Sequence, residues 1–328
     1  MQILGRRIPL WALGLIVLAL AGAAAFALTR ERAPEHPPVS ASTIEVGDAP
    51  QDIDVSGSIV WVVNGGDRTA QPIASPTEPG TEWTAGRGIR LGELPGGIAV
   101  AEGAVWVGAI EGNEIRRIDL TAPRARAMRR VEVGQTPQAV AVGSEAVWAA
   151  SFDDGSIWKI AMEGDRPVAE SFALEDAFPS DLATGFGSVW ITDVVDNTLV
   201  RMDEVTGAVT QEIPVGDSPT AVAVGEGAVW VANFNDATIT HIDPETNEQV
   251  GQPIIVGGKP GGIAAGEGYV WVTRPEDDSV IRIDPVESEW TGEVFEVGDG
   301  PQGIAAGDGS VWTADQGGDT VTRLTLQR

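Results

Sequence analysis

The stretch GEGAVWVANFNDATITHIDP (residues 225–244) contains a glycine-flanked turn, an apolar run around Trp230, a polar loop and a second apolar run that ends at Asp243. A closely similar arrangement occurs seven times along the 328-residue chain. Each copy contains a Val-Trp pair, with the tryptophans at Trp61, Trp106, Trp148, Trp190, Trp230, Trp271 and Trp312. A proline lies 11 residues before each of them, at Pro50, Pro95, Pro137, Pro179, Pro219, Pro260 and Pro301. Self-similarity at a fixed period predicts a repeat architecture.

Each repeat has the composition of β-strands. Val, Ile, Thr and Trp dominate the apolar runs, and Gly, Pro, Asp and Asn occupy the gaps between them. No 3.6-residue periodicity persists for the length of a helix in this region. Four such runs in about 40 residues match the period of a propeller blade. We therefore predict an all-β fold, a seven-bladed β-propeller over residues 42–328.

The two ends of the repeat region complement each other. The last repeat begins at Pro301 and contains only three strand-like runs. The segment STIEVGDAP (42–50) matches EVFEVGDGP (293–301), which ends the fourth strand of the sixth repeat. We expect the N-terminal strand from Ser42 to complete the last blade. Such closure removes open sheet edges, which would otherwise expose unpaired backbone groups.

The segment VWVANFNDATITHIDPETNEQVGQPIIVGGKPGGIA (229–264) resembles the YVTN-type repeats of bacterial extracytoplasmic propellers, with Trp230 where that repeat has tyrosine. The resemblance covers all seven repeats and extends to the virginiamycin B lyase-like propellers. Those lyases use paired histidines, a glutamate and Mg²⁺ on one face. This chain has only His36, before the ring, and His241, on an expected third strand. The catalytic histidines are therefore not matched, and the resemblance implies the fold without the lyase chemistry.

The N-terminal region has the features of a membrane anchor. Residues 8–28 are uncharged and almost wholly apolar, and Arg6 and Arg7 precede them. This length spans a hydrocarbon core of about 30 Å, although Ala25-Phe26-Ala27 would suit a signal peptidase and leaves secretion open. The basic N-terminus favours a single-pass membrane protein with its propeller extracellular or periplasmic. The expected segments are a short cytoplasmic basic segment at 1–7, a transmembrane helix or signal sequence at 8–28 and a Pro-rich linker at 29–41.

The charge of the chain excludes several classes of partner. Its 48 acidic and 21 basic residues give a net charge of −27, which repels nucleic acid and anionic lipid headgroups. The acidic residues concentrate in the loops around the prolines and after the second strands, which share one face in a propeller. Asp also suits such loops because its side chain bonds nearby backbone groups. The chain has no cysteine, so disulfides and thiol catalysis are excluded.

Three carboxylates interrupt the pattern of the innermost strands. Two residues after the proline, five repeats have Gly or Ala, but the first and fourth have Asp52 and Asp181. Four residues after it, six repeats have Ala, and the first has Asp54. Small residues suit the crowded centre of a ring, and positions that break such a rule are often functional.

A second set of polar residues ends the second strands, at Asn64, Asp193, Asn233 and Asp315. We expect these oxygen ligands to converge over the channel with Asp52, Asp54 and Asp181 as a ligand-binding site. Ca²⁺ or Mg²⁺ is the cofactor that such oxygens suit, with Asp52 and Asp181 as its ligands. No EF-hand loop and no catalytic constellation is present in the sequence.

Two functions remain open. The first is a membrane-tethered, monomeric binding or sensing module that holds a protein, peptide or cationic ligand on its acidic face without catalysis. The alternative is a divalent-metal-dependent enzyme of the lyase or lactonase propeller kind. The seven repeated tryptophans are expected to pack between blades, because one occurs at the same place in every repeat. Trp83 and Trp290 lie outside this pattern and are expected to cover outer strands.

Overall fold

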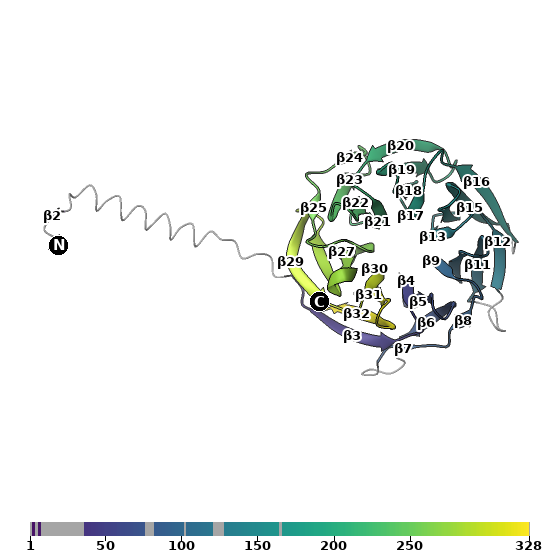
Figure 1. Ribbon diagram of the computed structural model, residues 1–328, viewed down its shortest axis with the longest axis horizontal. Coiled ribbons are helices and arrows are strands. Elements are labelled where there is room, and N and C mark those ends of the chain that lie inside the picture. The colour runs from purple at the N-terminus through teal and green to yellow at the C-terminus, as the bar shows by residue number, and fades with distance from the viewer. Residues whose placement is uncertain are drawn as a thin grey trace. The chain divides into compact units, whose positions relative to one another are not determined.

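The computed structural model describes residues 2–3, 6–7, 36–75, 82–101, 103–120, 128–163 and 166–327. Residues Val39–Leu326 form one compact unit. It consists of seven antiparallel sheets arranged as blades around a channel (Figure 1), which confirms the predicted seven-bladed β-propeller. The short strands β1 (Gln2–Ile3) and β2 (Arg6–Arg7) pair with each other in a separate unit.

The predicted transmembrane segment, residues 8–28, lies outside the described residues. Within the part of the chain that the structure describes, no helix has the length and apolar character needed to cross a membrane.

We number the blades 1 to 7 in the chain order of their innermost strands, which surround the channel. The innermost strands are β4 (Pro50–Ser56), β9 (Pro95–Ala101), β13 (Pro137–Val142), β17 (Pro179–Gly185), β21 (Pro219–Gly225), β26 (Ile263–Gly266) and β30 (Pro301–Gly307). The second strands are β5 (Ile59–Asn64), β10 (Ala104–Ala109), β14 (Val147–Ser151), β18 (Ser188–Asp193), β22 (Ala228–Asn233), β27 (Tyr269–Arg274) and β31 (Ser310–Asp315).

The third strands are β6 (Thr69–Ala74), β11 (Glu114–Asp119), β15 (Ser156–Glu163), β19 (Thr198–Asp203), β23 (Thr238–Asp243), β28 (Ser279–Asp284) and β32 (Thr320–Leu326). The outer strands are β7 (Thr84–Ala85) with β8 (Ile89–Arg90), β12 (Met128–Glu132), β16 (Arg166–Ala173), β20 (Val209–Pro214), β24 (Glu248–Gln249) with β25 (Ile254–Ile255), β29 (Glu289–Glu296) and β3 (Val39–Glu45). A short 3-10 helix, η1 (Pro275–Asp277), follows β27.

The N-terminal strand closes the ring as predicted. Strand β3 pairs with β32 along its whole length, from Val39 opposite Leu326 to Glu45 opposite Thr320. It therefore supplies the fourth strand of blade 7. The strand begins at Val39, before the expected start at Ser42, because Val39 also packs against the core that includes Leu324.

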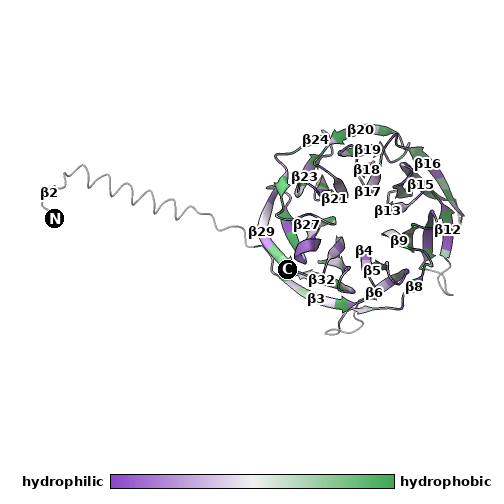
Figure 2. Cartoon of the chain, in the orientation of Figure 1, coloured by the Kyte–Doolittle hydropathy of each residue, from purple (hydrophilic) through white to green (hydrophobic). Residues whose placement is uncertain are grey.

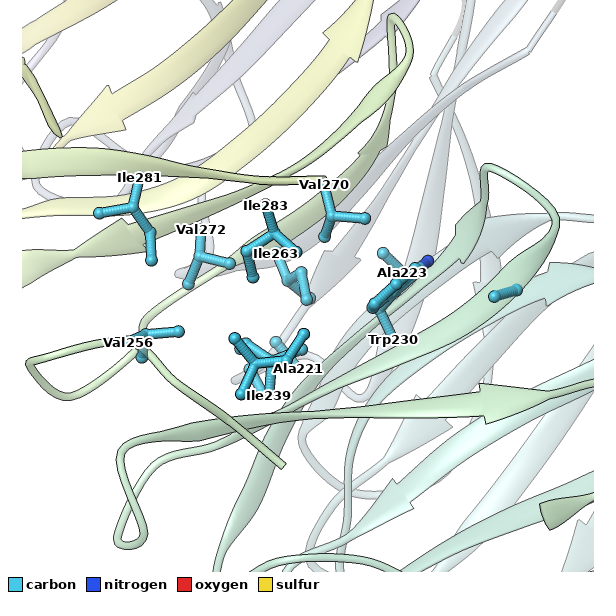
Figure 3. Packing of buried hydrophobic residues seen from close by; sticks show 13 residues of the cluster. Ala221, Ala223, Trp230, Ile239, Val256, Ile263, Val270, Val272, Ile281 and Ile283 are labelled. Atoms are coloured by element: carbon cyan, nitrogen blue, oxygen red, sulfur yellow. The ribbon is translucent and has the colours of Figure 1, made fainter. Parts of the chain in front are cut away.

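The hydrophobic core lies between neighbouring blades. The tryptophans of the second strands are at most 3% exposed, which confirms their predicted packing role. The cluster around Trp230, for example, also contains Ile263 and Ile281 of the next blade (Figure 3). Trp83 is half-buried and meets Trp312 edge to face, with 4.7 Å between ring centres. Figure 2 shows both hydrophobic and hydrophilic segments within the blades, as expected for strands with one buried face.

A basic residue or a histidine covers the tryptophan in six blades. It lies directly opposite on the third strand, 11 residues later in sequence: Arg117, Lys159, Arg201, His241, Arg282 and Arg323. The Arg201 guanidinium lies 4.6 Å from the Trp190 ring centre, and the His241 ring stacks on Trp230 at 4.1 Å. These contacts add cation–π and stacking attraction to the packing. The sequence shows this pairing as a basic residue or histidine 11 positions after the tryptophan.

Candidate functional site

A β-bulge at the start of the innermost strand directs side chains into the channel. In blade 1, Pro50 pairs with Asn64 and Asp52 pairs with Val63, so Gln51 is the extra residue. Blade 4 has the same shift between Pro179 and Asp181. Proline lacks an N–H for the strand ladder, and a bulge changes the direction of the residues that follow it. Asp52 and Asp181 come directly after these bulges and line the channel.

The channel carboxylates join adjacent blades. Asp52, Asp54 and Asp181 each accept the N–H of the residue that follows them, at 2.7–2.9 Å. The other oxygen of each accepts an N–H from the next blade: Ile98 for Asp52 (2.9 Å), Val100 for Asp54 (2.6 Å) and Val222 for Asp181 (2.9 Å). The carboxylates therefore connect blade 1 to blade 2 and blade 4 to blade 5.

Burial makes these three carboxyl groups unusually weak acids. It raises the pKa of Asp52 to about 6 and the pKa values of Asp54 and Asp181 to about 7, although the backbone N–H bonds partly oppose the shift. The charge of Asp52 further raises the pKa of both Asp54 and Asp181. Carboxyl groups of blades 1 and 4 therefore interact across the channel, and their charge changes near neutral pH.

Two cavities occupy the channel. One of about 630 Å³ lies at the face that carries the proline loops, and one of about 420 Å³ lies toward the other face. Asp52 and Asp181 line both cavities, whereas Asp54 lines only the second. We refer to the larger one as the central cavity.

The central cavity combines carboxylates with an apolar rim. Ile110, Phe234 and Pro275 line it from the loops that follow the second strands. The Lys259 ammonium lies 4.6 Å from the centre of the Phe234 ring. The hydroxyl of Thr220, another lining residue, has no hydrogen-bond partner among the described residues. The composition of the loops did not predict this rim, although its three residues share one sequence position, four after the tryptophan.

The other four predicted site residues do not reach the channel, so the expected convergence is wrong for them. Asn64, Asp193, Asn233 and Asp315 are at most 3% exposed and lie within their own blades. They end the second strand, where the register places them opposite the first residue of the third strand. Their side chains point into the blade and not into the channel.

Asn233 and Asp315 show what these buried residues do instead. Asn233 accepts the N–H of Gly216 at 3.1 Å and donates to two threonine hydroxyl groups of β23. Asp315 accepts the hydroxyl hydrogen of Thr322 at 2.7 Å, and burial raises its pKa. These residues fix the loop before the proline to the start of the third strand.

Much of the acidic charge on the proline-loop face stabilises turns. Asp67, Asp154 and Asp236 accept backbone N–H groups of the loop that precedes the proline of their own blade, at 2.7–3.0 Å. Asp278 and Asp319 accept N–H groups of the next blade, both at 2.9 Å. Both have positive φ, which Asp tolerates better than most residues. The acidic composition therefore does not by itself define a binding face.

Within the described part of the chain, Asp52 and Asp181 have no third metal-ligating neighbour that would complete a site. Among the residues that the structure describes, no group of three or more His, Asp or Glu is arranged to hold a metal ion. Both oxygens of each channel carboxylate already accept backbone N–H groups.

The fold is that of known propellers, and the sequence is distant from them. No protein-family model and no curated protein sequence matches the chain. A streptogramin B lyase structure is 18% identical with a TM-score of 0.76, over 90% of this chain and 100% of that one. Virginiamycin B lyase from Staphylococcus aureus is 20% identical with a TM-score of 0.74, over 88% and 100%. Kuenenia stuttgartiensis hydrazine synthase is 13% identical with a TM-score of 0.71, over 91% and 98%.

These proteins carry out different chemistry on one architecture, so the similarity establishes the fold alone. The chain is a virginiamycin B lyase-like seven-bladed β-propeller in its fold.

Proposed function

We propose that this protein is a binding module whose central cavity takes an organic cation with an apolar body. The observation that carries the proposal is the pair Asp52 and Asp181, which line a cavity with an apolar rim. The ionised carboxylates attract a positive charge, and Ile110, Phe234 and Pro275 provide the apolar contact.

We place this module outside the cytoplasm, tethered by residues 8–28. The support is the sequence alone: an apolar segment of sufficient length, preceded by two arginines and followed by a strongly acidic chain. We do not propose the metal-dependent enzyme, because the described residues offer no convergent ligand set.

Thermal unfolding of the full-length chain with benzyltrimethylammonium tests the proposal. We expect this probe to raise the melting temperature more than sodium chloride at the same ionic strength, because binding to the native state stabilises it by RT ln(1 + [L]/Kd). The effect should grow from about pH 5 to about pH 8, since the cation binds the ionised carboxylates, whose pKa values are about 6 and 7.

Two double variants distinguish binding in the central cavity from a general effect of the protein's negative charge. The double change Asp52→Asn with Asp181→Asn should remove the response. Glu248→Gln with Glu287→Gln, two exposed acids outside the cavity, should leave it intact. An equal response in both double variants would overturn the proposal. Stabilisation by Ca²⁺ or Mg²⁺ that disappears with Asp52 and Asp181 would favour the metal-dependent alternative.

A further inference from the structure

A third cavity, of about 750 Å³, lies between blades 4 and 5 on the face opposite the proline loops. Phe186 in the β17–β18 turn and Gly227 in the β21–β22 turn border it, and Arg201 and His241 contribute from the third strands. None of its lining residues lines the channel cavities. We refer to it as the blade 4–5 cavity, and the inference below does not rest on the proposed function.

The cavity exists where a contact between blades is missing. At the next two junctions, an acid in the corresponding turn accepts an N–H from the turn of the following blade. Glu226 accepts from Gly268 and Glu267 accepts from Gly309, each at 2.9 Å. Phe186 occupies this position in blade 4, and its side chain has no hydrogen-bond acceptor. The N–H of Gly227 consequently has no hydrogen-bond partner within the described residues.

Phe186 is an unusual residue for its position. Its φ is 54°, in the left-handed region that a bulky side chain disfavours, and its side chain is 49% exposed. An exposed aromatic residue with a disfavoured backbone φ does not fit the residue preferences of such a turn. Exceptions of this kind occur preferentially at functional sites.

Hydrogen bonds from two of its three nitrogens fix the guanidinium group of Arg201. Nε donates to Ser188 Oγ at 2.8 Å, and Nη1 donates to the Pro244 carbonyl at 2.8 Å and to Asn247 Oδ1 at 2.6 Å. The Trp190 ring lies beneath it. We find no hydrogen bond from Nη2 to any described residue, so this donor is available to a ligand.

The cavity also presents negative charge. Asp243 and Glu245 line it. Asp243 Oδ1 accepts the Glu245 N–H at 2.7 Å, which fixes the turn, and Glu245 is exposed. His241 also lines the cavity, and its Nδ1 lies 2.7 Å from Ser288 Oγ.

We propose that the blade 4–5 cavity binds an apolar α-amino acid. The carboxylate binds Arg201 Nη2 and the Gly227 N–H, and the ammonium group binds Asp243 and Glu245. The apolar side chain packs against Phe186. A cavity with both signs of charge complements a zwitterion, whereas a ligand with one charge leaves the opposite group of the protein unmatched.

Histidine NMR of the full-length chain tests this directly, because His241 is one of only two histidines. The probes are L-phenylalanine, 3-phenylpropionate, which lacks the ammonium group, and phenethylamine, which lacks the carboxylate. We expect phenylalanine to shift the His241 ring signal saturably and to leave His36 unchanged. The two single-charge analogues should bind at least tenfold more weakly. Equal binding of phenethylamine, or no shift with any probe, would overturn the proposal.

A variant that restores the missing contact provides the second test. Phe186→Glu places an acceptor where blades 5 and 6 have one, and it should close the cavity onto Gly227. We expect at least tenfold weaker phenylalanine binding without a lower melting temperature. Val205→Glu adds the same charge at a 70% exposed position outside the cavity and should bind like the wild type. Unchanged phenylalanine binding by Phe186→Glu would refute the assignment.

Discussion

Replacing Asp181 by asparagine should change how the stability of the propeller depends on pH. The pKa of Asp181 is raised from 3.8 to about 7, mainly because the carboxyl group is buried. Between these values the folded protein retains a proton that the unfolded chain has released. The resulting stabilisation is complete below about pH 4 and is lost as the pH rises through about 7. Asparagine does not ionise and therefore removes this dependence.

The size of the pKa shift of Asp181 determines how much the free energy of unfolding changes with pH. A rise of roughly three pKa units corresponds to about 4 kcal/mol of unfolding free energy, which is an upper limit. Asp181 lines the channel, so water reduces the effect to about 1–2 kcal/mol. Relative to the wild type, Asp181→Asn should therefore gain about 1–2 kcal/mol as the pH rises from about 4 to about 8.

Urea unfolding at constant ionic strength over this pH range measures the difference. The control is Glu248→Gln, which removes one negative charge from an exposed position and should run parallel to the wild type. Parallel curves for Asp181→Asn and the wild type would show that burial of this carboxyl group does not oppose its ionisation.

Three further predictions concern the fold. Deleting residues 1–47 removes β3 and should give an aggregating protein, whereas deleting 1–38 should preserve the melting temperature; equal behaviour would contradict closure by β3. In denaturant titrations, Trp230→Ala should cost about 3–5 kcal/mol, and Trp83→Ala, at a half-buried site, about 1–2 kcal/mol. Similar losses would refute the packing assignment. Gly303→Ala should cost about 1–3 kcal/mol and weaken benzyltrimethylammonium binding, because its Cβ would lie 2.7 Å from Asp52 Cα. If Gly303→Ala kept wild-type stability and binding, the backbone near Gly303 would accommodate the added Cβ without displacing Asp52.

The sequence by itself determined the architecture. The fixed distance from proline to tryptophan set the strands of each blade, and the match between residues 42–50 and 293–301 identified the closing strand. Both signals are local, because every blade repeats the same pairing and packs only on its neighbours. The departure of Asp52, Asp54 and Asp181 from the small-residue pattern likewise located three channel carboxylates.

The tertiary structure alone decided which polar residues share a space. Asn64 and Asp52 are close in sequence, yet the bulge after Pro50 turns Asp52 into the channel while Asn64 stays within the blade. The blade 4–5 cavity depends on Phe186 and Gly227, whose turns meet only when the blades pack. Side-chain direction depends on bulge, register and the neighbouring blade, and a repeat pattern read along one chain specifies none of these.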